Sequence, residues 1–127
     1  MIDELWYNEN HVWILIEDNL ARIGISDYIQ EQLGDINFIE LPEAGDKLVR
    51  GKSFGHIESE ETVFELIAPV SGKVIEINSD AVDNPVIIGE DPLGDGWLIE
   101  IENVDMKELK SLMDQEKYEK FVKELSK

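Results

Sequence analysis

The middle of this chain is divided at short, regular intervals by glycine and proline. The dividing residues are Pro42, Gly45, Gly51, Gly55, Pro69 and Gly72. They break this part of the sequence into segments of about five or six residues, which is the usual length of a β-strand. Such regular division is typical of an all-β sandwich or barrel.

The segments on either side also predict strands. Residues 12–16 form a β-branched and aromatic run that ends at an acidic turn signal, and residues 20–25 follow as the expected hairpin partner. Three further segments, which alternate apolar and polar residues as half-buried strands do, are residues 35–41, 73–78 and 97–101.

Two regions predict helices. Ser26 is an expected N-cap and Gly34 an expected left-handed stop, so a helix of about two turns should lie between them. Residues 106–125 contain neither proline nor glycine and predict one or two amphipathic helices packed on the sheet, the alternative being a partner-binding helix. We expect one domain over residues 1–127, with a β core at about 5–102 and a helical segment at 105–126.

The chain carries a formal net charge of −18, and this charge is unevenly distributed. Residues 1–104 contain 23 acidic and five basic residues, whereas residues 105–127 contain six of each. Such an acidic body repels phosphate backbones and anionic lipid headgroups, so we expect no nucleic-acid partner and no membrane partner. It would attract a basic protein surface or a cation; the other interpretation is that it only maintains solubility.

The sequence lacks three features that would indicate secretion or a membrane location. The chain has no cysteine, so it has no disulfide, no thiolate metal site and no cysteine nucleophile. Its first residues lack the basic and apolar regions of a signal peptide. No apolar run approaches the roughly 18 residues that a membrane-spanning helix needs. We therefore expect a soluble, cytoplasmic protein.

Five blocks, in order and at the right spacing, resemble the H-protein family of the glycine cleavage system. They are Tyr-Asn-Glu-Asn-His-Val-Trp at residues 7–13, and the blocks at residues 23–30, 33–45, 69–74 and 90–98. The longest of these, Leu-Gly-Asp-Ile-Asn-Phe-Ile-Glu-Leu-Pro-Glu-Ala-Gly at residues 33–45, is the closest match. The resemblance covers roughly residues 5–113.

This resemblance implies a mainly β fold, a barrel-sandwich hybrid of the lipoyl- and biotinyl-carrier kind, with a short internal helix and one or two C-terminal helices. It also implies a protein that is not an enzyme. Members of the family carry a lipoyl group on a lysine at a hairpin tip. The implied partners are glycine decarboxylase, aminomethyltransferase, dihydrolipoyl dehydrogenase and lipoyl-attaching enzymes.

The chain departs from the family at the attachment turn. The family reads approximately Glu-Ser-Val-Lys-Ala there, whereas this chain reads Glu58, Ser59, Glu60, Glu61 and Thr62. Glu61 therefore occupies the lysine position, and no lysine lies anywhere between residues 53 and 72. Since a glutamate side chain cannot form the amide that a lysine amine forms, we expect lipoyl attachment to be lost and no cofactor to be bound.

The remaining candidate residues have structural interpretations. His11 corresponds to a family histidine near the carrier surface, but a hydrogen-bonded structural role is favoured for it and for His56. Trp13 and Trp97 are expected in the core. Four residues could form a metal cluster: His56, Glu58, Glu60 and Glu61. This cluster is disfavoured, because a strand would turn Glu61 away from the other three and the spacing matches no known metal site.

Three functions follow from these observations. The first is a non-lipoylated, H-protein-like module that binds and regulates glycine-cleavage or lipoyl-handling enzymes. The second is a true carrier, with the lipoyl group on Lys52, Lys73 or a lysine of the C-terminal helix. The third is a scaffold reused to bind an unrelated ligand or protein. An enzyme has the least support, since no catalytic dyad, triad or phosphate loop is evident.

Overall fold

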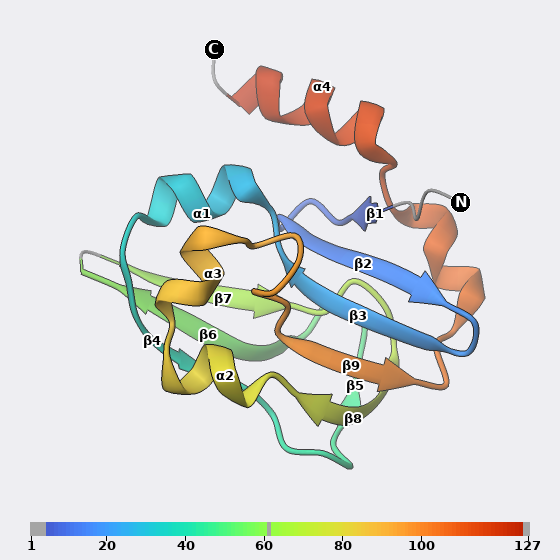
Figure 1. Ribbon diagram of the computed structural model, residues 1–127. Coiled ribbons are helices and arrows are strands. Elements are labelled where there is room, and N and C mark those ends of the chain that lie inside the picture. Colours follow the sequence, from blue (N-terminus) through green and yellow to red (C-terminus); the bar gives the residue numbers. More distant parts are fainter. Residues whose placement is uncertain (1–4, 61, 126–127) are drawn as a thin grey trace.

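The computed structural model describes residues 5–60 and 62–125 (Figure 1). In chain order the elements are β1 (Leu5–Tyr7), β2 (Val12–Glu17), β3 (Leu20–Ile25), α1 (Asp27–Leu33), β4 (Ile36–Glu40), β5 (Lys47–Leu48), β6 (Ser53–Ser59), β7 (Val63–Ile67), β8 (Gly72–Ile77), α2 (Ser79–Asp83), α3 (Val86–Glu90), β9 (Ile99–Glu102), the 3₁₀ helix η1 (Met106–Ser111) and α4 (Gln115–Leu125). Within the described ranges, no helix is both long and apolar enough to cross a bilayer.

The strands form two antiparallel sheets in the described part of the chain. The larger has the order β1-β2-β3-β9-β8-β5, and the smaller has the order β4-β6-β7. Neither sheet closes on itself, and the two lie against each other with the helices at the periphery (Figure 1). The predicted mainly β class with a C-terminal helix is confirmed.

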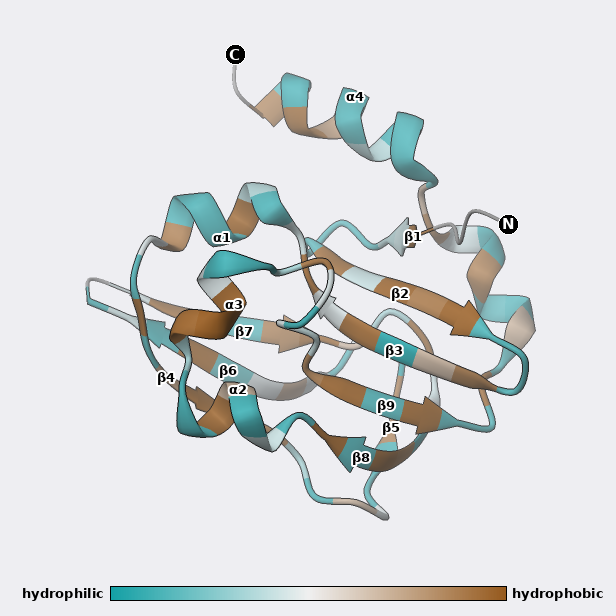
Figure 2. Ribbon diagram, viewed as in Figure 1, coloured by the Kyte–Doolittle hydropathy of each residue, from teal (hydrophilic) through white to brown (hydrophobic). Residues whose placement is uncertain are grey.

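The main core lies between the two sheets. Ile14, Ile23 and Ile101 from the larger sheet are buried in one cluster with Ile57 and Leu66 from the smaller sheet. Figure 2 shows hydrophobic residues along the strands of both sheets. Burial of this apolar surface is the main favourable term that holds the sheets together.

The helix α1 has the predicted ends. The Ser26 side chain accepts a hydrogen bond from the backbone N–H of Ile29 at 3.2 Å, and Gly34 ends the helix with φ of 71°. The C-terminal region forms the two helices that its pattern allowed, η1 and α4. The second packs beside β1, with Tyr118 buried at the contact.

Two short helices lie between residues 78 and 97, a segment of the expected β core for which the sequence predicted no element. These are α2 and α3, and the last strand begins at Ile99 instead of residue 97. Ala81 and Ile88 are fully buried from these helices, so packing outweighs the strand preference of β-branched residues in α3. The buried Asn78 side chain donates to the carbonyls of Asp95 and Trp97 and fixes the loop that follows.

Ser26→Ala is expected to lower the free energy of unfolding by about 2–3 kcal/mol, because Ser26 Oγ is buried and accepts two hydrogen bonds. One comes from Ile29 and the other from the Tyr118 hydroxyl, at 2.6 Å. Asp105→Ala is the control, since Asp105 caps η1 at the surface through a single bond from the Lys107 N–H. Denaturant titration should give the control a loss of about 1 kcal/mol or less; equal losses would contradict this account.

Candidate functional site

The β6–β7 hairpin holds the residues that the sequence singled out. Glu58 is paired with Val63 at its last register position, and Ser59 closes the turn. The Ser59 backbone N–H donates to the Thr62 carbonyl at 2.9 Å, and the Ser59 hydroxyl donates to the same oxygen at 3.3 Å. Glu60 and Thr62 are exposed beside this turn, whereas Glu61 lies outside the described residues. The ends of β6 and β7 beside these hydrogen bonds lie at the edge of the molecule (Figure 1).

Two lysines flank the hairpin in sequence but lie away from its tip. Lys52 precedes β6 at the opposite end of the strand, and a seven-residue strand spans roughly 23 Å. Lys73 lies in β8, in the other sheet. A lipoyl group on either lysine would therefore start from a different part of the surface.

His56 lies between two carboxylates on the exposed side of the small sheet. Its Nδ1 is 3.2 Å from Glu40 Oε2, and its Nε2 is 3.3 Å from Glu58 Oε2. The Phe38 ring lies beside it, with ring centroids 5.9 Å apart. In the ranges that the structure describes, no three histidine, aspartate or glutamate side chains form a group that could hold a metal ion. Glu61, a member of the disfavoured cluster, lies outside those ranges.

His11 belongs to a half-buried polar network that joins three segments. Its Nδ1 lies 2.8 Å from the Tyr118 hydroxyl, which donates to Ser26 Oγ at 2.6 Å. The rings of Tyr28 and Phe121 lie beside the imidazole. Burial lowers the pKa of His11 below its usual value. The structural role that the sequence favoured for this residue fits these contacts.

The lowered pKa of His11 predicts a contribution to stability that is lost in acid. The unfolded chain binds a proton on His11 at about pH 6.5, whereas the folded chain resists it, so stability falls as pH drops through the unfolded value. His11→Asn removes the titrating group and tolerates the backbone φ of 67° at this position. The difference in unfolding free energy, wild type minus variant, should decrease between about pH 7.5 and pH 5. A difference independent of pH would contradict the assignment.

Sequence reasoning missed two buried tyrosines. The Tyr7 and Tyr118 rings stack at 4.0 Å, and the Tyr7 hydroxyl donates to Gln115 Oε1 at 2.9 Å. Burial raises the pKa of Tyr118 to about 12 and raises the pKa of Tyr7 as well. Helical spacing could have indicated the burial of Tyr118, because this residue shares one face of α4 with Phe121 and Val122.

The two tryptophans that the sequence predicted in the core, Trp13 and Trp97, differ in burial. Trp13 is buried as expected, and its Nε1–H donates to the Pro92 carbonyl at 3.0 Å. Its ring fills the space over Gly24, where a Cβ would lie 2.5 Å from the ring. Trp97 is only partly buried, and the Arg22 guanidinium lies 4.8 Å above its ring. The core prediction is therefore confirmed for Trp13 and holds only in part for Trp97.

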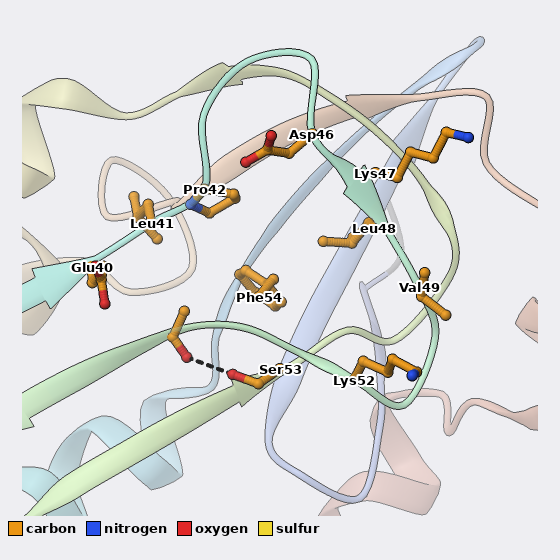
Figure 3. Close-up of a pocket in the computed structure, with 11 residues that line it drawn as sticks. Glu40, Leu41, Pro42, Asp46, Lys47, Leu48, Val49, Lys52, Ser53 and Phe54 are labelled. Atoms are coloured by element: carbon orange, nitrogen blue, oxygen red, sulfur yellow. Dashed lines mark hydrogen bonds between the residues drawn. The ribbon is translucent and has the colours of Figure 1, made fainter.

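An open hollow of about 510 Å³ lies where β4 leads into β5 and β6 begins, away from the hairpin tip (Figure 3). Phe54 and Leu48 form its apolar floor, and Lys47 extends away from it. Glu40, Asp46 and Lys52 also line the hollow, so its charges have no single sign. Such a shallow surface of mixed charge does not define a ligand class.

Comparisons with known proteins agree with the fold. The model of the family described as glycine cleavage H-protein matches residues 5–125. The chain is 47% identical over 121 residues to a glycine cleavage system H protein of Geobacillus sp. (strain WCH70), covering 95% of both. It is 49% identical over 121 residues to the one from Oceanobacillus iheyensis, covering 95% of this chain and 96% of that one.

A solved structure gives the same result. The crystal structure of a glycine cleavage system H protein from Mycobacterium marinum superposes with a TM-score of 0.83 at 37% identity, covering 93% of this chain and 95% of that one. The family match and the related H proteins define a carrier-type protein and not an enzyme. The chain belongs to the glycine cleavage H-protein family.

Proposed function

We propose that this chain works in the glycine cleavage system as an H-type docking protein whose hairpin tip bears no lipoyl group. Kinship along nearly the whole chain supports the assignment to this system. One observation carries the second part of the proposal: residue 61 is glutamate, and residues 53–72 contain no lysine. The expected compartment is still the cytoplasm.

The chemistry of attachment supports a bare tip. Lipoylation forms an amide between the lipoyl carboxyl and a lysine amine, and a glutamate side chain offers no amine. The turn beside Glu61 nevertheless keeps its closing hydrogen bonds from Ser59 to Thr62. A protein that recognises the hairpin by shape would therefore meet a side chain that cannot be loaded.

The proposed partners are those that the family implies. They are glycine decarboxylase, aminomethyltransferase, dihydrolipoyl dehydrogenase and lipoyl-attaching enzymes. The acidic body supports docking on basic protein surfaces and opposes binding to nucleic acid or anionic lipid. Bound without an arm, the chain would compete with a loaded H protein for the same enzymes.

A second candidate function is carriage of the lipoyl group on another lysine. The relatives named above are all called H proteins, and this favours a carrier over a purely regulatory role. Against it, Lys52 and Lys73 lie away from the hairpin tip. No observation favours the third alternative, a scaffold reused for an unrelated ligand or protein.

Two measurements on one sample separate these functions. The purified chain is incubated with a lipoyl-attaching enzyme, ATP and lipoate, weighed by intact mass spectrometry, and then titrated into each glycine-cleavage enzyme. The H protein of Geobacillus sp. is the positive control for both steps. We expect binding without a gain in mass. A lipoyl gain mapped to another lysine would establish the carrier, and the lack of any binding would contradict both functions.

A further inference from the structure

One side of the small sheet points away from the core and gathers an unusual set of residues. Two rows cross the strands β4, β6 and β7 there, because the register pairs Phe38 with Glu58 and Val63, and Glu40 with His56 and Glu65. Side chains alternate along a strand, so their neighbours Ile39, Ile57 and Leu66 point into the core. We call the outward set the hairpin face: Phe38, Glu40, His56, Glu58, Val63 and Glu65.

The first row of the hairpin face exposes two large apolar side chains. Phe38 is 48% exposed and Val63 is 57% exposed, and they flank Glu58 next to the hairpin turn. Aromatic side chains that stand out of a sheet supply much of the binding energy when a partner covers them. This row thus offers an apolar contact directly beside the site that the family uses.

The charge of the hairpin face has one sign. The strands β4, β6 and β7 contain no lysine or arginine, while three of the six side chains on the face are carboxylates. Both ring nitrogens of His56 contact a carboxylate, Nδ1 that of Glu40 and Nε2 that of Glu58. These two contacts orient the Glu40 and Glu58 carboxylates.

The third carboxylate of the face, that of Glu65, is also held in place by a neighbouring side chain. The Ser53 hydroxyl donates to Glu65 Oε2 at 2.6 Å. No lysine or arginine in the described ranges lies within 4.0 Å of the Glu40, Glu58 or Glu65 carboxylate. The face thus holds three positioned acceptors around exposed apolar groups, and its strands supply no lysine or arginine to pair with them.

We propose that the hairpin face is the docking surface for a basic enzyme surface, on which arginine or lysine side chains surround an apolar hollow that receives Phe38. Cations there would pair with Glu40, Glu58 and Glu65, and the hollow would cover Phe38 and Val63. This inference rests on the proposed function, since the partner is one of the glycine-cleavage enzymes. It deepens that function by assigning the contact to these six residues.

The test uses the full chain and three purified enzymes: glycine decarboxylase, aminomethyltransferase and dihydrolipoyl dehydrogenase. Dissociation constants are measured by calorimetry at low and high salt. The double variant Glu40→Lys/Glu65→Lys reverses charge on the face, and Glu17→Lys/Glu116→Lys makes the same change on exposed residues elsewhere. The face variant should weaken binding about tenfold or more and reduce its salt dependence, while the control changes binding about twofold or less.

A second pair of variants tests the apolar contact. Val63→Ser is compared with Val86→Ser, because these valines are 57% and 58% exposed and Val86 lies on α3, outside the face. Only Val63→Ser should weaken binding, and thermal melting confirms that both variants fold. If the wild type binds but each face variant matches its control, the hairpin face is not the interface and the proposed function stands. If the wild type binds none of the three enzymes, or the face mediates self-association instead, the docking surface is overturned.

Discussion

Glu61→Lys is expected to change a chain that gains no lipoyl group into one that gains a single group. The substitution restores the one amine that the chemistry requires, in a segment of residues 53–72 that otherwise has no lysine. The neighbouring turn residues Glu58 and Ser59 already match the family, so a lipoyl-attaching enzyme should recognise the hairpin. Intact mass spectrometry after co-expression with that enzyme and lipoate measures the result directly.

Glu60→Lys is the matched control for this gain of function. It introduces the same amine, with the same change of charge, one residue away. Because a lipoyl-attaching enzyme must take up one particular position of the turn, a lysine one residue earlier should stay unmodified. A Glu61→Lys protein that remains at its bare mass would contradict the alignment of the hairpin with the family's attachment turn. Equal modification of both variants would show that position within the turn is unimportant.

Gly55→Ala is expected to cost about 3 kcal/mol or more of unfolding free energy. A Cβ at Gly55 would overlap the backbone carbonyl oxygen of Glu40 and press on its carbonyl carbon at 3.2 Å. These are backbone atoms of the neighbouring strand, so β4 must separate from β6 and lose ladder hydrogen bonds. Denaturant titration measures the loss, and the variant should also bind partners less well because the hairpin face includes both strands.

Gly89→Ala is the control for this effect. A Cβ there meets only the Gln30 side chain, whose amide nitrogen is nearest at 3.2 Å, and this flexible group can move aside. Gly89 also lies in α3, where alanine is favoured over glycine by up to about 1 kcal/mol. The control should therefore change stability by about 1 kcal/mol or less in either direction. A Gly55→Ala protein as stable as this control would contradict the close approach of β4 and β6.

The sequence predicted elements that are determined by neighbouring residues. The β2–β3 hairpin follows from an acidic turn between two β-branched runs, and α1 follows from Ser26 and Gly34 at its ends. The helix α3 escaped prediction because Val86, Ile87 and Ile88 prefer strands in isolation. The burial of Ile88 in the main core favours the helix α3, and the local sequence pattern does not indicate this contact.

In the candidate site, too, what neighbouring residues determine could be predicted and what the strand register determines could not. The loss of the lysine at Glu61 needs only an alignment of the turn. The hairpin face needs the strand register, which shifts between Ile36 and Phe38 and again between Ser53 and Gly55. A one-residue shift moves every later side chain to the other side of a sheet, so the rows that place Phe38 beside Glu58 could not be inferred. The network of His11 and Tyr118 joins residues 107 positions apart and was equally out of reach.

The central claim is that this H-family chain carries no lipoyl group, and the intact mass of the protein purified from its native source tests it most directly. We predict the mass of the unmodified polypeptide, with no lipoyl group added. An added mass equal to a lipoyl group, on any lysine, would contradict the claim and establish the carrier function instead.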